Sequence, residues 1–488
     1  MRLLKQSGRA VAATLVIIGA AVLGGCDTIK SNLLEATDPS NISPGAVQSP
    51  GGATAVRNGA LSRLRTATAD GESSWLFGGL LVDEWATSST FVQNDETDQR
   101  SIQLNNSTVN GDLRALYRVI TDANQAVDLL NKWKPTPTYD IGEMYFARGF
   151  AELQLASDFC NGIPLSNGTG PVPLFGQPLP VKDVFGAASA SFDTAMQVSA
   201  LSLQKSKGDT TGATIILNAS KIAKARALLG IGLSNAAAAA ALVSGIPTNF
   251  HYDVTASLTG GTNTLWDQPT SQNRYIIGDS ITGKYRSILV KNAIPFFSAH
   301  DRRVPANYKL GAKGDTIKAQ DGGTLVIEAD SLWGPSTAVP LTSGLDARLI
   351  EAEAALKGGD AAGMMTILNS LRASPQLLTA SSPTSTGTHP GWTTPVMPAL
   401  TDPGTDDGRV NLLFREKAFW TFGRGQRLGD LRRLIRDYGR NPNGSDAGGY
   451  PVGQHYKGGV YGIDLNLPVT TDEQVGNTNF HGCLDRKA

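Results

Sequence analysis

The sequence of 488 residues lacks an excess of charge of either sign. Lys and Arg together number 43, Asp and Glu together number 43, and charged residues make up 18% of the chain. This share is below the roughly one quarter that is usual in globular domains. A chain without a basic excess or an acidic tail gives no indication of a nucleic-acid partner. Its length suffices for one large domain or for roughly two or three ordinary ones.

Metal-binding and catalytic patterns are missing. The five histidines are scattered, and no Cys-x-x-Cys or His-x-x-x-His pair and no Gly-x-Ser-x-Gly sequence occurs. Asp83 and Glu84 would point to opposite faces of a strand, and Glu351 and Glu353 would diverge on a helix, so neither pair is arranged for glycoside hydrolysis. We therefore expect no catalytic activity, no metal site and no cofactor. A calcium loop formed by Asp95, Glu96 and Asp98 is the alternative for the metal.

Long apolar runs are almost absent as well. One run, residues 10–23, follows a basic start with Arg2, Lys5 and Arg9. The run of roughly 14 residues is shorter than the roughly 20 that cross a bilayer. It therefore predicts a secretory signal rather than a membrane span, and no second stretch approaches membrane length.

Cys26 follows this run directly, after Leu23-Gly24-Gly25, and the sequence resembles the lipobox of bacterial lipoproteins. We expect residues 1–25 to be a signal peptide and the Cys26 thiol to carry lipid. Each buried CH₂ of the acyl chains would contribute roughly 0.8 kcal/mol, which would hold the protein on a membrane surface. The alternative is an ordinary cleaved signal, or a short anchor helix, in which Cys26 has no role. Asp27 leaves inner-membrane retention open.

Cysteine is rare, since only Cys26, Cys160 and Cys483 occur. If Cys26 carries lipid, Cys160 and Cys483 are the only possible pair in an oxidising compartment. A disulfide between them would tie the C-terminal tail to the first half of the chain. The long loop that it closes places its stabilisation at the upper end of the usual ~2–4 kcal/mol. Two unrelated thiols are the alternative.

Apolar residues at helical spacing predict a series of helices that come in pairs. The predicted helices are residues 112–133, 144–159, 188–204 and 219–243, then 345–357 and 361–371, then 410–422 and 426–438. Gly358 and Gly359 end one helix, and Asp360 can cap the next. A long irregular region, residues 245–340, contains strand-like fragments. This order predicts a mainly α, tetratricopeptide-like helical-repeat scaffold with long irregular loop-rich insertions and minor β structure.

Two segments carry a family resemblance. The first is RLIEAEAALKGGD at 348–360, and the second is FREKAFW at 414–420 followed by GQRLGDLRR at 425–433. The first is similar to the third helix pair of the SusD/RagB family, and the second is similar to the C-terminal signature of that family. Weaker matches are LVDEW at 81–85, DRRVP at 301–305 and LPV at 467–469. The loop at 161–180, which follows a cysteine, and the break at 423–425 depart from the usual pattern of the family.

The resemblance implies one domain over residues 26–488, with an N-terminal part at about 27–340 and a C-terminal helical part at about 341–488. It implies about four helix pairs under a loop-rich face. It also implies an outer-membrane, surface-exposed, lipid-anchored protein without enzymatic activity. Members of the family deliver oligosaccharides, or in some cases peptides, to a TonB-dependent (SusC-like) transporter.

Sugar binding requires flat apolar faces that stack on pyranose rings and planar polar groups that reach hydroxyls. Loop aromatics and polar side chains near them are the candidates. The candidate ligand-binding residues are Trp75, Asp83, Trp85, Phe91, Arg100, Trp266, Tyr285, Trp333 and Trp392. The alternative is that half or more of the rings fill the core between loops and helices.

A cluster of arginines near the C-terminus invites comparison with a phosphate-binding patch. The arginines are interleaved with Glu416, Asp430 and Asp437 at helical spacing, so we predict ion pairs within the scaffold instead. They are Arg415, Arg424, Arg427, Arg432, Arg433 and Arg436.

The favoured hypothesis is a surface lipoprotein that binds oligosaccharide or polysaccharide nutrients and delivers them to a partner transporter. One alternative keeps the scaffold and changes the ligand to a peptide. Another is a structural or assembly lipoprotein that uses its helical repeats for protein contacts alone. The sequence gives neither the ligand nor the transporter.

Overall fold

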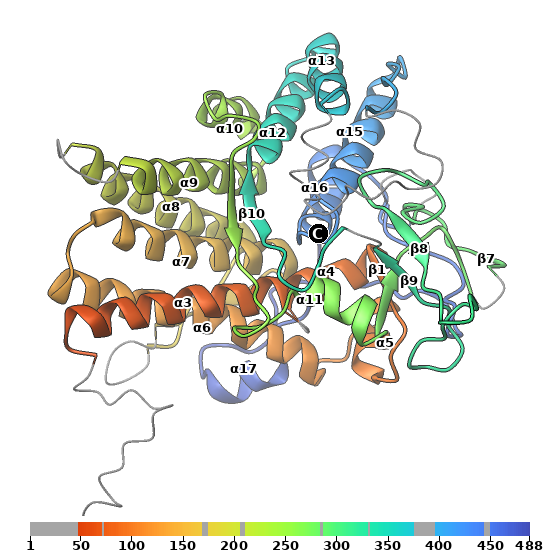
Figure 1. Cartoon of the computed structure of the whole chain (residues 1–488), viewed down its shortest axis with the longest axis horizontal. Helices are drawn as coiled ribbons and strands as arrows, with labels where there is room; N and C mark the ends of the chain where they lie inside the picture. Colours follow the sequence, from red (N-terminus) through yellow and green to blue (C-terminus); the bar gives the residue numbers. More distant parts are fainter. Residues whose placement is uncertain are drawn as a thin grey trace, which may run out of the picture.

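The computed structural model describes residues 47–70, 73–167, 174–204, 210–283, 286–329, 332–374, 396–443 and 449–488. The predicted signal sequence and Cys26 lie outside these ranges. Layered helices form one end of the molecule, and short strands and loops form the other (Figure 1). Among the residues described, no helix is long and apolar enough to cross a bilayer.

The fold is mainly α, and consecutive helices pack as tetratricopeptide-like pairs. The long stack at one end contains α3 (Pro50–Ala69), α6 (Ser107–Trp133), α7 (Thr138–Asp158), α8 (Val181–Leu203) and α9 (Thr210–Ile231) (Figure 1). It continues through α10 (Ala236–Val243), α12 (Gly344–Lys357), α13 (Ala361–Arg372), α15 (Asp406–Trp420) and α16 (Arg427–Tyr438). Four short helices are α4 (Ser74–Leu81), α5 (Val92–Asp98), α11 (Thr264–Trp266) and α17 (Thr471–Gly476).

Helices α7 and α8 approach closely because glycines face the contact. A Cβ at Gly142 would lie 2.0 Å from the Ser199 hydroxyl oxygen, and one at Gly149 would lie 2.9 Å from the Phe192 ring. Neither position has room for a side chain, so the small residues set the spacing of this pair.

One helical prediction needs correction, and one helix was not predicted. The Ala-rich helix predicted at 219–243 is broken: α9 ends at Ile231, and a 3₁₀ turn at Leu233–Asn235 precedes α10. Gly232 stands at the break, where its poor helix propensity favours an end. Helix α3 was missed because it buries mostly small residues, such as Ala53 and Ala60, which give a weak apolar pattern.

The strands occur as antiparallel pairs, and two of these pairs, β1–β5 and β4–β10, join distant parts of the chain. The pairs are β1 (Trp85–Thr87) with β5 (Tyr275–Ile277), β4 (His251–Val254) with β10 (Val339–Ser343), β8 (Ala306–Tyr308) with β9 (Ile327–Ala329), β6 (Ile281–Thr282) with β7 (Ile288–Leu289), and β2 (Ile163–Pro164) with β3 (Pro178–Leu179). The β1–β5 pair matters most for the site, because it fixes the long insertion onto the first loop segment.

The C-terminal tail is fastened to the end of α7. Cys160 and Cys483 form a disulfide with 6.0 Å between their Cα atoms. The amide of Cys160 donates to the carbonyl oxygen of Leu467 over 2.9 Å, and the amide of Leu484 donates to that of Asn161 over 2.7 Å. The covalent link thus lies within a patch that hydrogen bonds also hold together.

Buried ion pairs join the last helices to one another. Lys417 on α15 lies 2.6 Å from Asp430 on α16 and 3.2 Å from Glu353 on α12. Arg433 also contacts Glu353, and the pKa of this carboxyl is lowered to about 2 by its two cations, against the effect of its burial. Because each buried charge has a partner here, removing one member would leave the others uncompensated.

Candidate functional site

Three of the predicted ligand-binding tryptophans are core residues. Trp75 and Trp85 are fully buried, and Trp333 nearly so. The Trp85 ring lies 6.1 Å from Trp333 and 5.0 Å from Phe422, measured between centroids. The structure brings these rings together, but it turns them inward. They fill the space between loops and helices, so a ligand outside the protein cannot stack on them.

Asp83 and Arg100 are also buried, and both make hydrogen bonds inside the protein. Arg100 donates hydrogen bonds to the carbonyl oxygens of Pro451 (2.6 Å) and Asp464 (2.9 Å). The Tyr461 hydroxyl donates to Asp83 over 3.1 Å. Burial raises the pKa of Asp83 well above its ordinary value, and the nearby Asp98 carboxyl adds to the effect. These two side chains hold the C-terminal segment to the first loop.

The remaining candidates divide into accessible residues and undescribed ones. Tyr285 and Trp392 lie outside the described residues. Trp266 is half-buried and packs against the core. Phe91, in contrast, is 40% exposed. It is the predicted ring that remains available to a ligand in the described chain.

The backbone of Phe91 is held in place by residues of its own segment. Phe91 is the N-cap residue of α5, and its carbonyl oxygen accepts from the amides of Asn94 (3.1 Å) and Asp95 (3.2 Å). Its own amide donates to the Ser89 hydroxyl over 3.2 Å. The exposed aromatic side chain of Phe91 is thus carried by a backbone that is fixed at the start of a helix.

A second segment brings a guanidinium group to this ring. Arg274 lies just before β5, and its carbonyl oxygen accepts from the Ser88 amide over 2.8 Å, which extends the β1–β5 pair. The Arg274 guanidinium carbon lies 5.2 Å from the centroid of the Phe91 ring. This distance is within the range of a cation–π contact.

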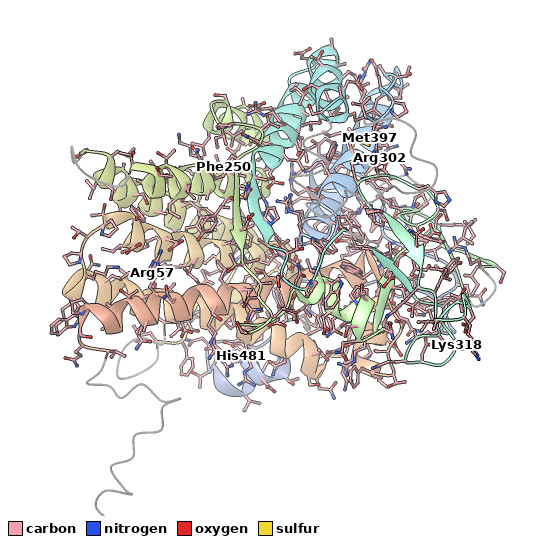
Figure 2. The ribbon with its side chains drawn as sticks, in the orientation of Figure 1. Arg57, Phe250, Arg302, Lys318, Met397 and His481 are labelled. Atoms are coloured by element: carbon pink, nitrogen blue, oxygen red, sulfur yellow. A yellow bond between two sulfur atoms is a disulfide. The ribbon has the colours of Figure 1, made fainter. Side chains whose placement is uncertain are left out.

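A third segment adds an exposed amide. Arg274 Nε donates to Gln320 Oε1 over 3.3 Å. The backbone of Gln320 and Asp321 is tied to the same region, since the Asp321 amide donates to the Ser88 carbonyl oxygen over 3.1 Å. Lys318, two residues before Gln320, lies at the loop-rich end of the molecule (Figure 2).

Lys457, from the C-terminal segment, completes the group. Its ammonium donates to Asp95 Oδ1 over 2.6 Å and to the Ser89 carbonyl oxygen over 2.7 Å. Partial burial raises the pKa of Asp95, and the Lys457 ammonium works against this rise. We call the group of Phe91, Asp95, Arg274, Gln320 and Lys457 the Phe91 platform.

The platform is suited to stacking and hydrogen bonding on an open surface. An exposed ring lies beside a guanidinium and a carboxamide, which are planar polar groups with several donors. A cavity lined by Ala86, Ile276, Tyr308 and Tyr456, which flank the same strand pair, has a volume of about 40 Å³. That is room for water molecules and not for a sugar ring. The geometry therefore favours a ligand that is an extended chain and lies with one side on the platform, rather than a small molecule enclosed by the protein.

Metal ligation has no support among the residues that the structure describes. In those ranges no group of three or more His, Cys, Asp or Glu side chains is placed to hold an ion. Asp95 and Asp98, which are close in sequence, are instead occupied by Lys457 and Tyr456.

Sequence reasoning missed Arg274, Gln320 and Lys457. Arg274 directly precedes a strand-like segment, Tyr275–Ile277, but nothing in the sequence shows that this strand pairs with Trp85–Thr87. Lys457 lies in a glycine-containing tail segment without a periodic pattern. Only the long-range pairing reveals that these residues share a surface.

Comparison with solved structures identifies the fold. A SusD superfamily protein from Bacteroides fragilis has a TM-score of 0.57 at 16% identity, over 89% of this chain and 99% of that one. Surface glycan-binding protein A from Bacteroides uniformis has 0.57 at 12% identity, over 89% and 99%. A SusD-like carbohydrate binding protein from Bacteroides vulgatus has 0.56 at 14%, over 89% and 97%. No family model and no curated protein matches the sequence.

Proposed function

We propose that this chain, which has the fold of the SusD superfamily, is a cell-surface lipoprotein that binds oligosaccharides or polysaccharides and delivers them to a partner TonB-dependent (SusC-like) outer-membrane transporter. The observation that carries the proposal is the Phe91 platform. It offers an exposed aromatic ring beside Arg274 and Gln320, on a fold that this chain shares with proteins described as carbohydrate-binding.

Binding would involve no change in covalent bonds. The Phe91 ring would stack on the C–H face of a sugar ring, while Arg274 and Gln320 would exchange hydrogen bonds with hydroxyls. Such contacts are individually weak, so a longer glycan that covers more of the loop-rich end would bind more tightly. Release to the transporter would then require only that a few contacts break.

The proposed anchor is the acylated Cys26 thiol. The basic start, the short apolar run at 10–23 and the cysteine that follows support this assignment. Several acyl chains on one residue would give stable attachment, with roughly 0.8 kcal/mol for each buried CH₂. The folded domain would then stand at the outer membrane beside the transporter.

Titration calorimetry on the full-length protein with a panel of oligosaccharides, neutral and acidic, and of casein-derived peptides tests the proposal. We expect heat from at least one glycan family, with affinity that rises with chain length. Binding to peptides alone would favour the peptide-uptake alternative. No binding to either class, together with copurification of another protein, would favour the assembly alternative. Either of the last two results would contradict glycan binding.

A further inference from the structure

A large cavity of the described chain shares no lining residue with the Phe91 platform. It is an open cleft of about 460 Å³ between α15 and two loop segments, one near Asn292 and one near Thr401. This volume is within the range of small-molecule sites. We call it the α15 cleft.

Arg427, at the start of α16, lines this cleft with an unpaired charge. Its side chain is only 3% exposed, yet it makes no hydrogen bond or ion pair with any described residue, and its buried Nε has no hydrogen-bond partner. The surrounding carboxyls compensate this charge only in part. Asp430 interacts with it most strongly, but the ion pair of Asp430 is with Lys417, 2.6 Å away. Burial raises the pKa of Glu84 to about 8 and that of Asp83 well above its ordinary value.

Arg415 is a second cation of the α15 cleft without a partner. It projects from α15 and is exposed, and its contact in the described chain is with the Phe419 ring, 5.1 Å from the guanidinium carbon. The adjacent carboxylate, Glu416, is occupied by Arg303 (2.7 Å) and Arg372 (2.9 Å). No ion pair within the described residues compensates Arg415.

The six clustered arginines differ in whether they have ion-pair or hydrogen-bond partners. The prediction of ion pairs holds for Arg424, Arg433 and Arg436. Arg432 instead donates to three backbone carbonyl oxygens. The two that lack such partners, Arg415 and Arg427, are the two that line the α15 cleft.

The other residues that line the cleft suit a ligand that has a ring and a negative charge. Ile294, Leu412 and Phe414 provide apolar surface, and Asn411 adds an amide whose Oδ1 already accepts from Arg440 over 3.1 Å. The Asn411 nitrogen therefore remains to donate. Guanidinium groups pair with carboxylates through planar, charge-assisted hydrogen bonds, which makes a carboxylate the natural complement of two free arginines.

We propose that the α15 cleft binds the carboxylate of an acidic sugar, a hexuronate unit, through Arg415 and Arg427. The sugar part of this assignment rests on the proposed function, while the carboxylate part rests on the cleft alone. The cleft would then act as a second binding point that selects acidic glycans from neutral ones.

Trigalacturonate and its fully methyl-esterified form test the proposal as matched ligands, because esterification removes the charge and keeps the ring. We expect calorimetry on the full-length protein to show at least about tenfold tighter binding of the acid. Arg415→Gln should remove most of this preference and leave the affinity for the ester unchanged. Arg409→Gln, which removes the same charge from the same helix outside the cleft, should keep it.

The outcomes separate the two proposals. Equal affinity for acid and ester, with neutral glycans still bound, would overturn the cleft assignment alone. Failure of every glycan, acidic or neutral, to bind would overturn the proposed function. An equal loss of the preference for acid over ester in Arg415→Gln and Arg409→Gln would also overturn the cleft assignment. So would an acidic tripeptide that binds as tightly as trigalacturonate and depends on Arg415 in the same way.

Discussion

Gly425 lies against the Trp75 ring so closely that a Cβ on it would come within 2.0 Å of Trp75 Cδ1. Two residues earlier, a Cβ on Gly423 would come within 2.6 Å of the Trp333 ring. Both glycines have positive φ, 67° and 62° in chain order. The two glycines in the break between α15 and α16 therefore make room for the rings of Trp75 and Trp333. This accounts for the Gly-x-Gly turn, which departs from the usual pattern of the family.

Gly425→Ala should destabilise the protein by about 2 kcal/mol or more, because the new methyl group meets the ring and the backbone is left-handed. Gly359→Ala is the matched control. Gly359 also has positive φ, 79°, but a Cβ there would meet nothing within 4 Å, so we expect about 1 kcal/mol. Urea unfolding followed by tryptophan fluorescence measures both. Equal losses would contradict the packing argument.

Trp85→Ala should act on stability, since the ring is fully buried between Trp333 and Phe422. We expect a loss of about 3–5 kcal/mol in the free energy of unfolding. Phe91→Ala, which removes an exposed ring, should cost less than about 1 kcal/mol. Thermal unfolding of the two variants decides between core and surface roles. A Trp85→Ala protein of wild-type stability would return Trp85 to the list of ligand contacts.

The buried Glu84 carboxyl should lower the free energy of unfolding as the pH rises. Burial raises its pKa from 4.5 to about 8, so the folded state keeps the carboxyl neutral. Because the folded pKa is above the unfolded one, the contribution is complete below about pH 4.5 and is lost as the pH rises through about 8. Glu84→Gln keeps an oxygen for the Gly423 amide and does not titrate. We expect the variant to gain stability over the parent between pH 5 and about pH 8.5 in urea unfolding; a difference independent of pH would argue against a neutral Glu84.

The disulfide should contribute strongly because it closes a loop with a sequence separation of 323 residues. Replacing Cys160 and Cys483 together by Ala should lower the free energy of unfolding by about 2–5 kcal/mol. The parent treated with reductant, compared with the double variant under the same conditions, is the control. If the variant unfolds at the same denaturant concentration as the oxidised parent, the bond does not stabilise the fold.

The helical scaffold was largely predictable from the sequence. Each of its pairs has an apolar stripe or a cap that acts within a few residues, such as Asp360, which accepts from the Gly363 amide over 2.8 Å. Such signals are local, and a sequence displays them directly.

The site was predictable only in part. Phe91 could be named as an exposed candidate, but Trp85 and Phe91 look alike in a sequence, because both are aromatic and both lie near turns. Their different burial depends on β1 pairing with β5 and on the glycine break nearly 340 residues later in the chain. The sequence did not single out Arg274 and Arg427 for the same reason, since residues that lie far along the chain decide which cations lack an ion-pair partner.

Glycan binding at the Phe91 platform is the central claim, and two exposed phenylalanines test it. Phe175, at 47% exposure, lies in the 174–204 segment and takes no part in the platform. Calorimetry with the tightest neutral oligosaccharide should show a roughly five- to tenfold loss of affinity in Phe91→Ala, which is the range expected for one stacking contact. Phe175→Ala should bind as the parent does. Full affinity in Phe91→Ala, or an equal loss in both variants, would contradict the account.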